Sequence, residues 1–219
     1  MSHVRAPLAT LAPGVVEVWT VRLDPDGTAS ERLLAGLSPD EADHARRLGS
    51  LGAPWAQAHL ALRGILALHL GLTGAQVRLT LGQGGKPELA PPATLRFSLS
   101  RTHGLALIAV SCDRAVGIDV ERVHEGIDVR AVAAAFLPPG EIAAIELAPE
   151  SSRRAAFFAA WTRVEARLKL TGEGLTASPA HETPLMLVRA IPLESGYAAS
   201  VAAEGGNWTV QRREWTVAV

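Results

Sequence analysis

Gly117-Ile118-Asp119-Val120-Glu121 alternates apolar and acidic side chains, and this stretch decides how the rest of the chain is interpreted. Alternate side chains of a strand share a face. We therefore expect Ile118 and Val120 to enter a core while Asp119 and Glu121 point together the other way. Two adjacent anions repel each other unless a cation or a hydrogen-bond donor lies between them. The same alternation also suits a half-buried strand with a hydrated face, so the pattern alone leaves both interpretations open.

A second segment, Trp161 to Lys169, contains no Gly or Pro and predicts a helix. Glu165 and Lys169 are four residues apart and would share one face of that helix. Such a pair is commonly a surface ion pair that contributes ~0.3 kcal/mol. Combined with the acidic pair on the strand, it could instead assemble a site for a divalent metal and a phosphate.

The bulk properties exclude several classes of protein. The chain has 219 residues, which suit one large domain or two small ones, and a formal net charge of −1, which argues against a dedicated nucleic-acid binder. One cysteine, Cys112, excludes an internal disulfide framework and fits the reducing cytoplasm. No apolar stretch approaches the ~20 residues of a membrane span, and the start lacks the apolar region of a signal peptide. We expect a cytoplasmic protein with no membrane association.

Local signals mark the helices and strands of a mixed α+β protein. Ser38-Pro39-Asp40-Glu41 has the pattern of a capping box that opens a helix, and Gly71 is placed to end the next one. Strands are predicted over residues 15–23, 77–81, 95–99, 105–111, 115–121, 184–190, 197–203 and 208–217. Helices are predicted over residues 38–48, 55–70, 128–136 and 151–170, with another short helix beginning at Glu141.

The two halves of the chain resemble each other. A tryptophan is followed by polar residues at +4 and +8 in both long helices, at Trp55, His59 and Arg63 and at Trp161, Glu165 and Lys169. Both helices run into a Leu-Thr-Gly. This weak repeat predicts two similar α+β lobes, residues 1–112 and 113–219, related by a pseudo-two-fold axis. A cleft between such lobes is a natural ligand site, and one chain would supply both of its walls, so a monomer is sufficient.

At this point the motifs resemble those of the 4′-phosphopantetheinyl transferases. The resemblance rests on Val116-Gly-Ile-Asp-Val-Glu-Arg122 followed by Trp161-Thr-Arg-Val-Glu-Ala-Arg-Leu-Lys169 and Gly172-Glu-Gly-Leu175. Upstream, Gly85-Lys86-Pro87 and Phe97-Ser98-Leu99-Ser100 are similar to stretches of the surfactin-synthetase-activating (Sfp-like) subgroup. The resemblance extends from about Ser38 to Tyr197.

The resemblance implies an enzyme that moves the phosphopantetheine arm of coenzyme A onto a serine hydroxyl of an apo acyl- or peptidyl-carrier protein, releasing adenosine 3′,5′-bisphosphate. Asp119, Glu121 and Glu165 would hold Mg²⁺, with Mn²⁺ as an alternative, against the pyrophosphate. Lys169 would hold a phosphate oxygen, and Glu165, directly or through a water, would take the serine proton. Asp119, Glu165 and Lys169 are therefore the expected catalytic residues.

Further residues are expected to bind coenzyme A or the carrier. The resemblance assigns Arg63, Lys86, Ser100, Arg101 and Lys169 to coenzyme A. Arg130, Arg153 and Arg154 are candidates for contact with an acidic carrier helix. The family pattern also contains an acidic residue that Glu141 matches without an assigned role.

The chain departs from the family pattern at several positions. Val164 replaces the usual lysine before Glu165, with Arg163 next to it, and Arg101 stands where the subgroup has histidine. The family's asparagine is Ser98, and Glu41 replaces a first-lobe lysine. These changes keep two alternatives open: a catalytically weak relative that binds coenzyme A or a carrier without efficient transfer, and a structural protein whose acids form a hydrated face.

Overall fold

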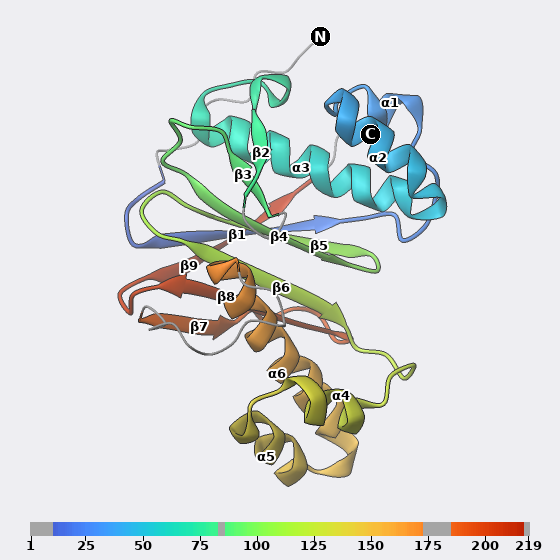
Figure 1. Ribbon diagram of the computed structural model, residues 1–219, viewed down its shortest axis with the longest axis vertical. Coiled ribbons are helices and arrows are strands. Elements are labelled where there is room, and N and C mark those ends of the chain that lie inside the picture. The colour runs from blue at the N-terminus through green and yellow to red at the C-terminus, as the bar shows by residue number, and fades with distance from the viewer. Residues whose placement is uncertain (1–10, 83–85, 173–184, 217–219) are drawn as a thin grey trace.

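The computed structural model describes residues 11–82, 86–172 and 185–216 and consists of two packed sheets, a small hairpin and helices on the outer faces (Figure 1). The first sheet has the order β4-β5-β1-β9, and the second β6-β8-β7. The strands of the first sheet are β1 Val15–Arg22, β4 Arg96–Thr102, β5 Leu105–Ser111 and β9 Thr209–Trp215. The second sheet contains β6 Val116–Arg122, β7 Met186–Ala190 and β8 Tyr197–Glu204, and the hairpin contains β2 Leu79–Leu81 and β3 Pro87–Leu89.

The helices follow the predicted signals closely. They are α1 Glu31–Leu34, α2 Pro39–Arg47, α3 Gly52–Leu70, α4 Val129–Phe136, α5 Pro139–Leu147 and α6 Glu150–Thr171, with 3₁₀ turns at Gly49–Leu51 and Gly74–Gln76. Both hydrogen bonds of the capping box at Ser38 are formed. Helix α3 ends at Gly71 (φ +66°) and α6 at Gly172 (φ +76°), in the left-handed conformation that glycine adopts at low cost. The sequence signals did not predict the short helix α1 or the short strand β3.

The core consists of two apolar layers. On one face of the first sheet, Trp19 and Ile108 pack with Leu62 and Ile65 of α3. On its other face, the first sheet packs against the second, where Ile118 enters the core together with residues that include Val18, Leu107, Val120 and Val201. The predicted inward direction of Ile118 and Val120 is thus confirmed, and the acidic side chains are left facing away from the core.

The long helices cover the outer faces of the two sheets (Figure 1). Helix α3 lies over the first sheet, and α6 packs on the second through Ala166 and Leu170 against Ala202. Helices α4 and α5 lie at the far end of α6 and share an apolar cluster with it that includes Ile145 and Phe157.

The predicted α+β class is confirmed, while the division into lobes stays a prediction. Strand β9 pairs in parallel with β1, with Val15 opposite Thr209 and Val21 opposite Trp215. A strand from the second half of the chain therefore completes the sheet of the first half. The boundary between residues 112 and 113 and the pseudo-two-fold relation are not tested by this pairing. Gly85 and residues 173–175, which contributed to the family resemblance, lie outside the described residues.

Candidate active site

The acidic pair lies on the face of β6 that α6 covers. Asp119 is buried, with 2% of its surface exposed, and Glu121 is half-buried at the end of the strand. Gly117, on the same face, makes this packing possible. A Cβ atom there would lie only 2.0 Å from the carbonyl oxygen of Ala166 and 2.4 Å from the amide nitrogen of Leu170. Because residue 117 has no side chain, the last turns of α6 lie directly against the strand that carries the acids.

This approach brings three predicted site residues into contact. The Lys169 Nζ donates to Asp119 Oδ1 at 2.7 Å and to Ser100 Oγ at 2.9 Å, and Ser100 Oγ donates to the same Asp119 oxygen at 2.9 Å. About a third of the Lys169 side chain is exposed. The strand motif and the helix motif therefore meet at one carboxylate, although 50 residues separate Asp119 and Lys169.

The other two acids interact with Asp119 electrostatically. Burial raises the pKa of Glu121 to about 7, and the charge of Asp119 and, more weakly, that of Glu165 act in the same direction. Burial and the charge of Asp119 also raise the pKa of Glu165, while Lys169 opposes both shifts. Asp119 therefore lies close enough to both glutamates to oppose their ionisation.

The chemistry of these acids fits a divalent cation. Asp119 Oδ2 is buried and has no hydrogen-bond partner among the described residues, because Lys169 and Ser100 both contact Oδ1. A cation near Oδ2 would supply the missing partner and relieve the repulsion with Glu121 and Glu165. Among the described residues, however, no three His, Cys, Asp or Glu side chains are gathered closely enough to form a complete metal cluster.

Like Ser100 and Lys169, two further residues assigned to coenzyme A make internal hydrogen bonds. Arg63 is buried; its Nε donates to Glu41 Oε2 at 2.7 Å, and its Nη1 donates to the carbonyls of Gly74 and Val77. Lys86 Nζ donates to the carbonyl of Lys169 at 2.6 Å and to that of Val116 at 3.3 Å.

These contacts tie each cation to the scaffold. Arg63 links α2 and α3 to the turn that follows α3, and burial lowers the pKa of Lys86, which bridges β6 and the end of α6. The assignment of both residues to coenzyme A stays a prediction.

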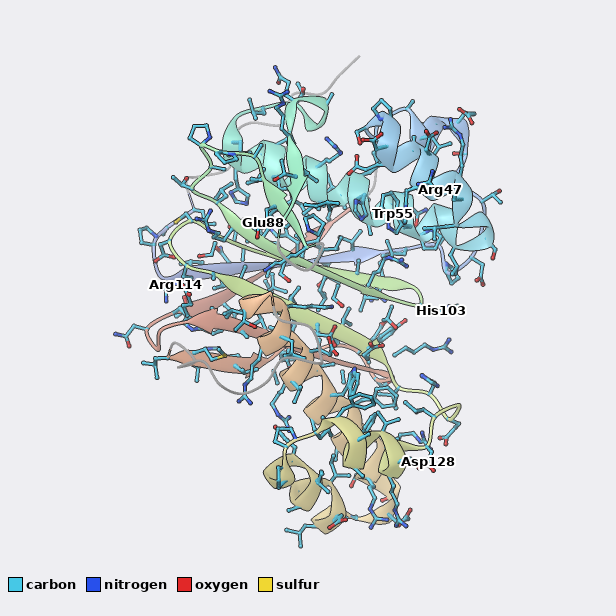
Figure 2. All side chains as sticks on the ribbon, in the orientation of Figure 1. Arg47, Trp55, Glu88, His103, Arg114 and Asp128 are labelled. Carbon is cyan, nitrogen blue, oxygen red and sulfur yellow. The ribbon has the colours of Figure 1, made fainter. Side chains whose placement is uncertain are left out.

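Aromatic and charged residues interact between α3 and β4. Trp55, labelled on α3 in Figure 2, stacks on His59 with ring centroids 3.6 Å apart. Burial lowers the pKa of His59, and the charges of Arg101 and Arg63 lower it further, although Glu41 opposes them. Arg101 is exposed on β4, and its charge acts on His59. Arg101 and the partly exposed Lys169 are thus predicted coenzyme A residues whose charged groups solvent can reach.

Two departures from the family pattern have a structural reason. Arg163, next to Val164, donates from Nε to Glu141 Oε1 at 3.0 Å, so the pair joins α6 to α5. Val164 packs in the apolar cluster of α4, α5 and α6. Glu41 is the third residue of α2, where it completes the predicted capping box, and it is also the ion-pair partner of Arg63.

Comparison with known proteins gives the family. Residues 115–217, which contain both acids of β6 and the whole of α6, match the family model described as the 4′-phosphopantetheinyl transferase superfamily. The chain is 31% identical over 222 residues to the 4′-phosphopantetheinyl transferase HetI of Nostoc sp., covering 93% of this chain and 94% of the relative. It is 29% identical over 140 residues to the 4′-phosphopantetheinyl transferase AcpT of Salmonella typhimurium, covering 64% of this chain and 69% of the relative.

The chain therefore belongs to the 4′-phosphopantetheinyl transferase superfamily. The prediction of an enzyme of this class is confirmed, and the alternative of a purely structural protein is set aside. Within the described ranges, no helix combines the length and the apolar character that crossing a membrane requires.

Proposed function

We propose that this protein transfers the 4′-phosphopantetheine arm of coenzyme A to a serine hydroxyl of an apo acyl- or peptidyl-carrier protein in the cytoplasm, acting as a monomer of the Sfp-like subgroup. The observation that carries the proposal is the contact of Asp119 with Lys169 and Ser100 beside Glu121 and Glu165. One buried oxygen of Asp119 has no hydrogen-bond partner within the described ranges. The ligand would lie in a cleft between two pseudo-symmetric lobes.

Asp119, Glu121 and Glu165 would hold Mg²⁺ or Mn²⁺, which when bound neutralises charge on the pyrophosphate. The buried Oδ2 of Asp119 is available as a ligand, since no described residue donates a hydrogen bond to it. Glu121 would be ionised more fully with the cation present than its raised pKa allows without it. This group of acids therefore gains more from a cation than an exposed acidic pair would.

The remaining steps belong to residues of the chain. Lys169 would hold a phosphate oxygen of coenzyme A and stabilise the leaving group, and Arg101 would bind at the 3′-phosphate end. Glu165, whose raised pKa brings it closer to neutral pH, is suited to accept the proton of the carrier serine. The serine oxygen then forms a bond to the β-phosphorus, and the bond from that phosphorus to the bridging oxygen of adenosine 3′,5′-bisphosphate breaks.

The carrier is expected to bind beside α4 and α5. Arg130 and Arg153 flank a groove of about 480 Å³ between these helices, lined by apolar residues that include Ile142 and Ile145. Arg153 and Arg154 are weaker candidates than Arg130, because Arg153 pairs with Glu150 and donates to the Ala148 carbonyl, and Arg154 donates to the carbonyls of the segment before α4. An acidic carrier helix would complement Arg130.

A catalytically weak relative is the second candidate function. It is favoured by the internal hydrogen bonds of Arg63 and Lys86, which leave fewer cations for coenzyme A. Binding without transfer would be the outcome if these residues keep their internal partners when the ligand is present.

One experiment separates the two functions. The protein is incubated with coenzyme A, Mg²⁺ and an apo-carrier, and the carrier is weighed; transfer adds roughly 340 Da to it. Asp119→Asn, which retains the Oδ1 acceptor, should lose transfer at least 100-fold while remaining folded. Coenzyme A binding heat without a mass gain would support the weak relative, and normal transfer by Asp119→Asn would contradict the metal assignment.

A further inference from the structure

Three hydroxyl side chains of β4 serve as hydrogen-bond acceptors for the free edge of β6. Strand β8 pairs with the other edge of β6. The backbone N–H groups of β6 that point toward β4 donate to side-chain oxygens at 3.1, 3.3 and 3.2 Å, from Ile118 to Ser98, from Val120 to Ser100 and from Arg122 to Thr102. From one of these hydrogen bonds to the next, both strands advance by two residues. The three hydroxyls thus take the place that the carbonyl acceptors of a neighbouring strand would have. Each such bond is called a rung below. We call Ser98, Ser100 and Thr102 the hydroxyl ladder.

Two rungs of the hydroxyl ladder also contact the acidic pair. Ser100 Oγ accepts from Val120 N and Lys169 Nζ and donates to Asp119 Oδ1, which uses the one donor and both acceptor positions of a hydroxyl. Thr102 Oγ1 accepts from Arg122 N and lies 3.4 Å from Glu121 Oε2. The first rung differs, because Ser98 lies beside the glycine of β6 rather than beside an acid.

The far end of the hydroxyl ladder is anchored to the second sheet. His103, labelled in Figure 2 at the turn between β4 and β5, accepts a hydrogen bond at its carbonyl from the Tyr197 hydroxyl of β8 at 3.0 Å. Strand β4 is therefore held to the second sheet along its length and at its end. Sliding β4 relative to β6 would break these bonds together.

We propose that the hydroxyl ladder is a positioning device that sets the register between the two sheets and orients the catalytic carboxylates. Ser100 is its central positioning residue, since it holds Asp119 Oδ1 beside Lys169, while the buried Oδ2 has no hydrogen-bond partner among the described residues. Where cation binding is concerned, this inference rests on the proposed function. The ladder itself is a property of the fold that can be measured without a cation.

The first test is amide hydrogen exchange by NMR on the metal-free protein. Ser98→Ala should accelerate exchange at Ile118 and Ser100→Ala at Val120, each by at least tenfold and each mainly at its own rung, because the N–H loses its acceptor. If exchange at Val120 is unchanged in Ser100→Ala, the hydroxyl ladder is overturned. Thr102→Val and Thr102→Ser form a matched pair at a less buried rung, and only the valine variant should accelerate exchange at Arg122.

The second test separates positioning from general stability. Both Ser98→Ala and Ser100→Ala should lower the melting temperature, but only Ser100→Ala should weaken Mn²⁺ binding, measured by electron paramagnetic resonance, by about tenfold. The same variant should lower kcat more than it raises the KM for coenzyme A. Equal loss of Mn²⁺ affinity in the two variants would show that Ser100 has no specific role. Failure of the unsubstituted protein to bind Mn²⁺ would reject the proposed function and the role of Ser100 toward the cation, while the exchange result would still decide the ladder.

Discussion

Replacing Gly117 with alanine tests the contact on which the site depends. The added Cβ would lie 2.0 Å from the Ala166 carbonyl oxygen, whereas ordinary van der Waals contact begins at 3.4 Å. The obstructing atoms belong to the backbone of α6, so no side-chain rotation can remove the clash. Helix α6 must therefore retreat from β6 by more than 1 Å, or the strand must bend.

The expected cost follows from this displacement. Overpacking a rigid site typically costs ~1–3 kcal/mol, and contact with backbone places Gly117→Ala at the upper end, about 3 kcal/mol. For a chain of this size, that loss corresponds to a fall in melting temperature of roughly 6–12 °C. A retreat of α6 also carries Lys169 and Glu165 away from Asp119, and a misplacement of ~1 Å can reduce the rate about 100-fold.

Thermal unfolding by circular dichroism and the carrier mass assay measure the two effects. Gly140→Ala is the matched control, because Gly140 lies in α5, and a Cβ there has no atom within 4 Å. That variant should keep full transfer and gain about 0.5 kcal/mol of stability. A Gly117→Ala protein with the melting temperature and the transfer rate of the unsubstituted protein would refute the argument from close packing.

The remaining predictions concern the pH dependence of stability. Burial alone would raise the pKa of Glu41, but hydrogen bonds from His59, Ser38 and Arg63 outweigh it and lower the pKa from 4.5 to about 2. The unfolded state then binds more protons in this window, so the free energy of unfolding should fall by on the order of 2 kcal/mol as pH drops from 4.5 toward 2. Glu41→Gln should lack this decline in urea titrations, and an identical decline would contradict it. Glu121 has the opposite sign: its raised folded pKa means that the metal-free protein should lose stability as pH rises from 4.5 to about 7. Glu121→Gln should remove this loss of stability, and millimolar Mg²⁺ should offset it in the unsubstituted protein. A melting temperature at pH 8 that does not change when Mg²⁺ is added would contradict the cation site.

Local signals were sufficient to predict most helices and strands, including the acidic strand and the long helix that carry the site residues. The capping box at Ser38 and the helix end at Gly71 depend only on neighbouring residues, so the predicted start of α2 and the predicted end of α3 agree with the structure. The alternation around Asp119 correctly predicted which side chains of β6 enter the core. By contrast, α1 is a single turn of four residues, too short for a periodic pattern to emerge.

Contacts between distant segments were not readable in the same way. Ser98, Ser100 and Thr102 alternate as any strand residues do, and nothing local shows that their hydroxyls meet the amides of β6. Arg63 and Lys86 were assigned to a ligand by resemblance, yet both contact carbonyl groups of the chain itself. Whether a cation serves a ligand or the backbone depends on which acceptors the fold brings near it.

The sequence by itself determined the class of the protein, the elements that carry its acids and the family to which it belongs, because periodicity, capping and motif spacing are properties of short segments. Only the tertiary structure decided that Lys169 and Ser100 share one oxygen of Asp119, while no residue that the structure describes donates to the other. That outcome depends on the distance between β6 and α6 at Gly117, and such a distance is set by the packing of the whole molecule.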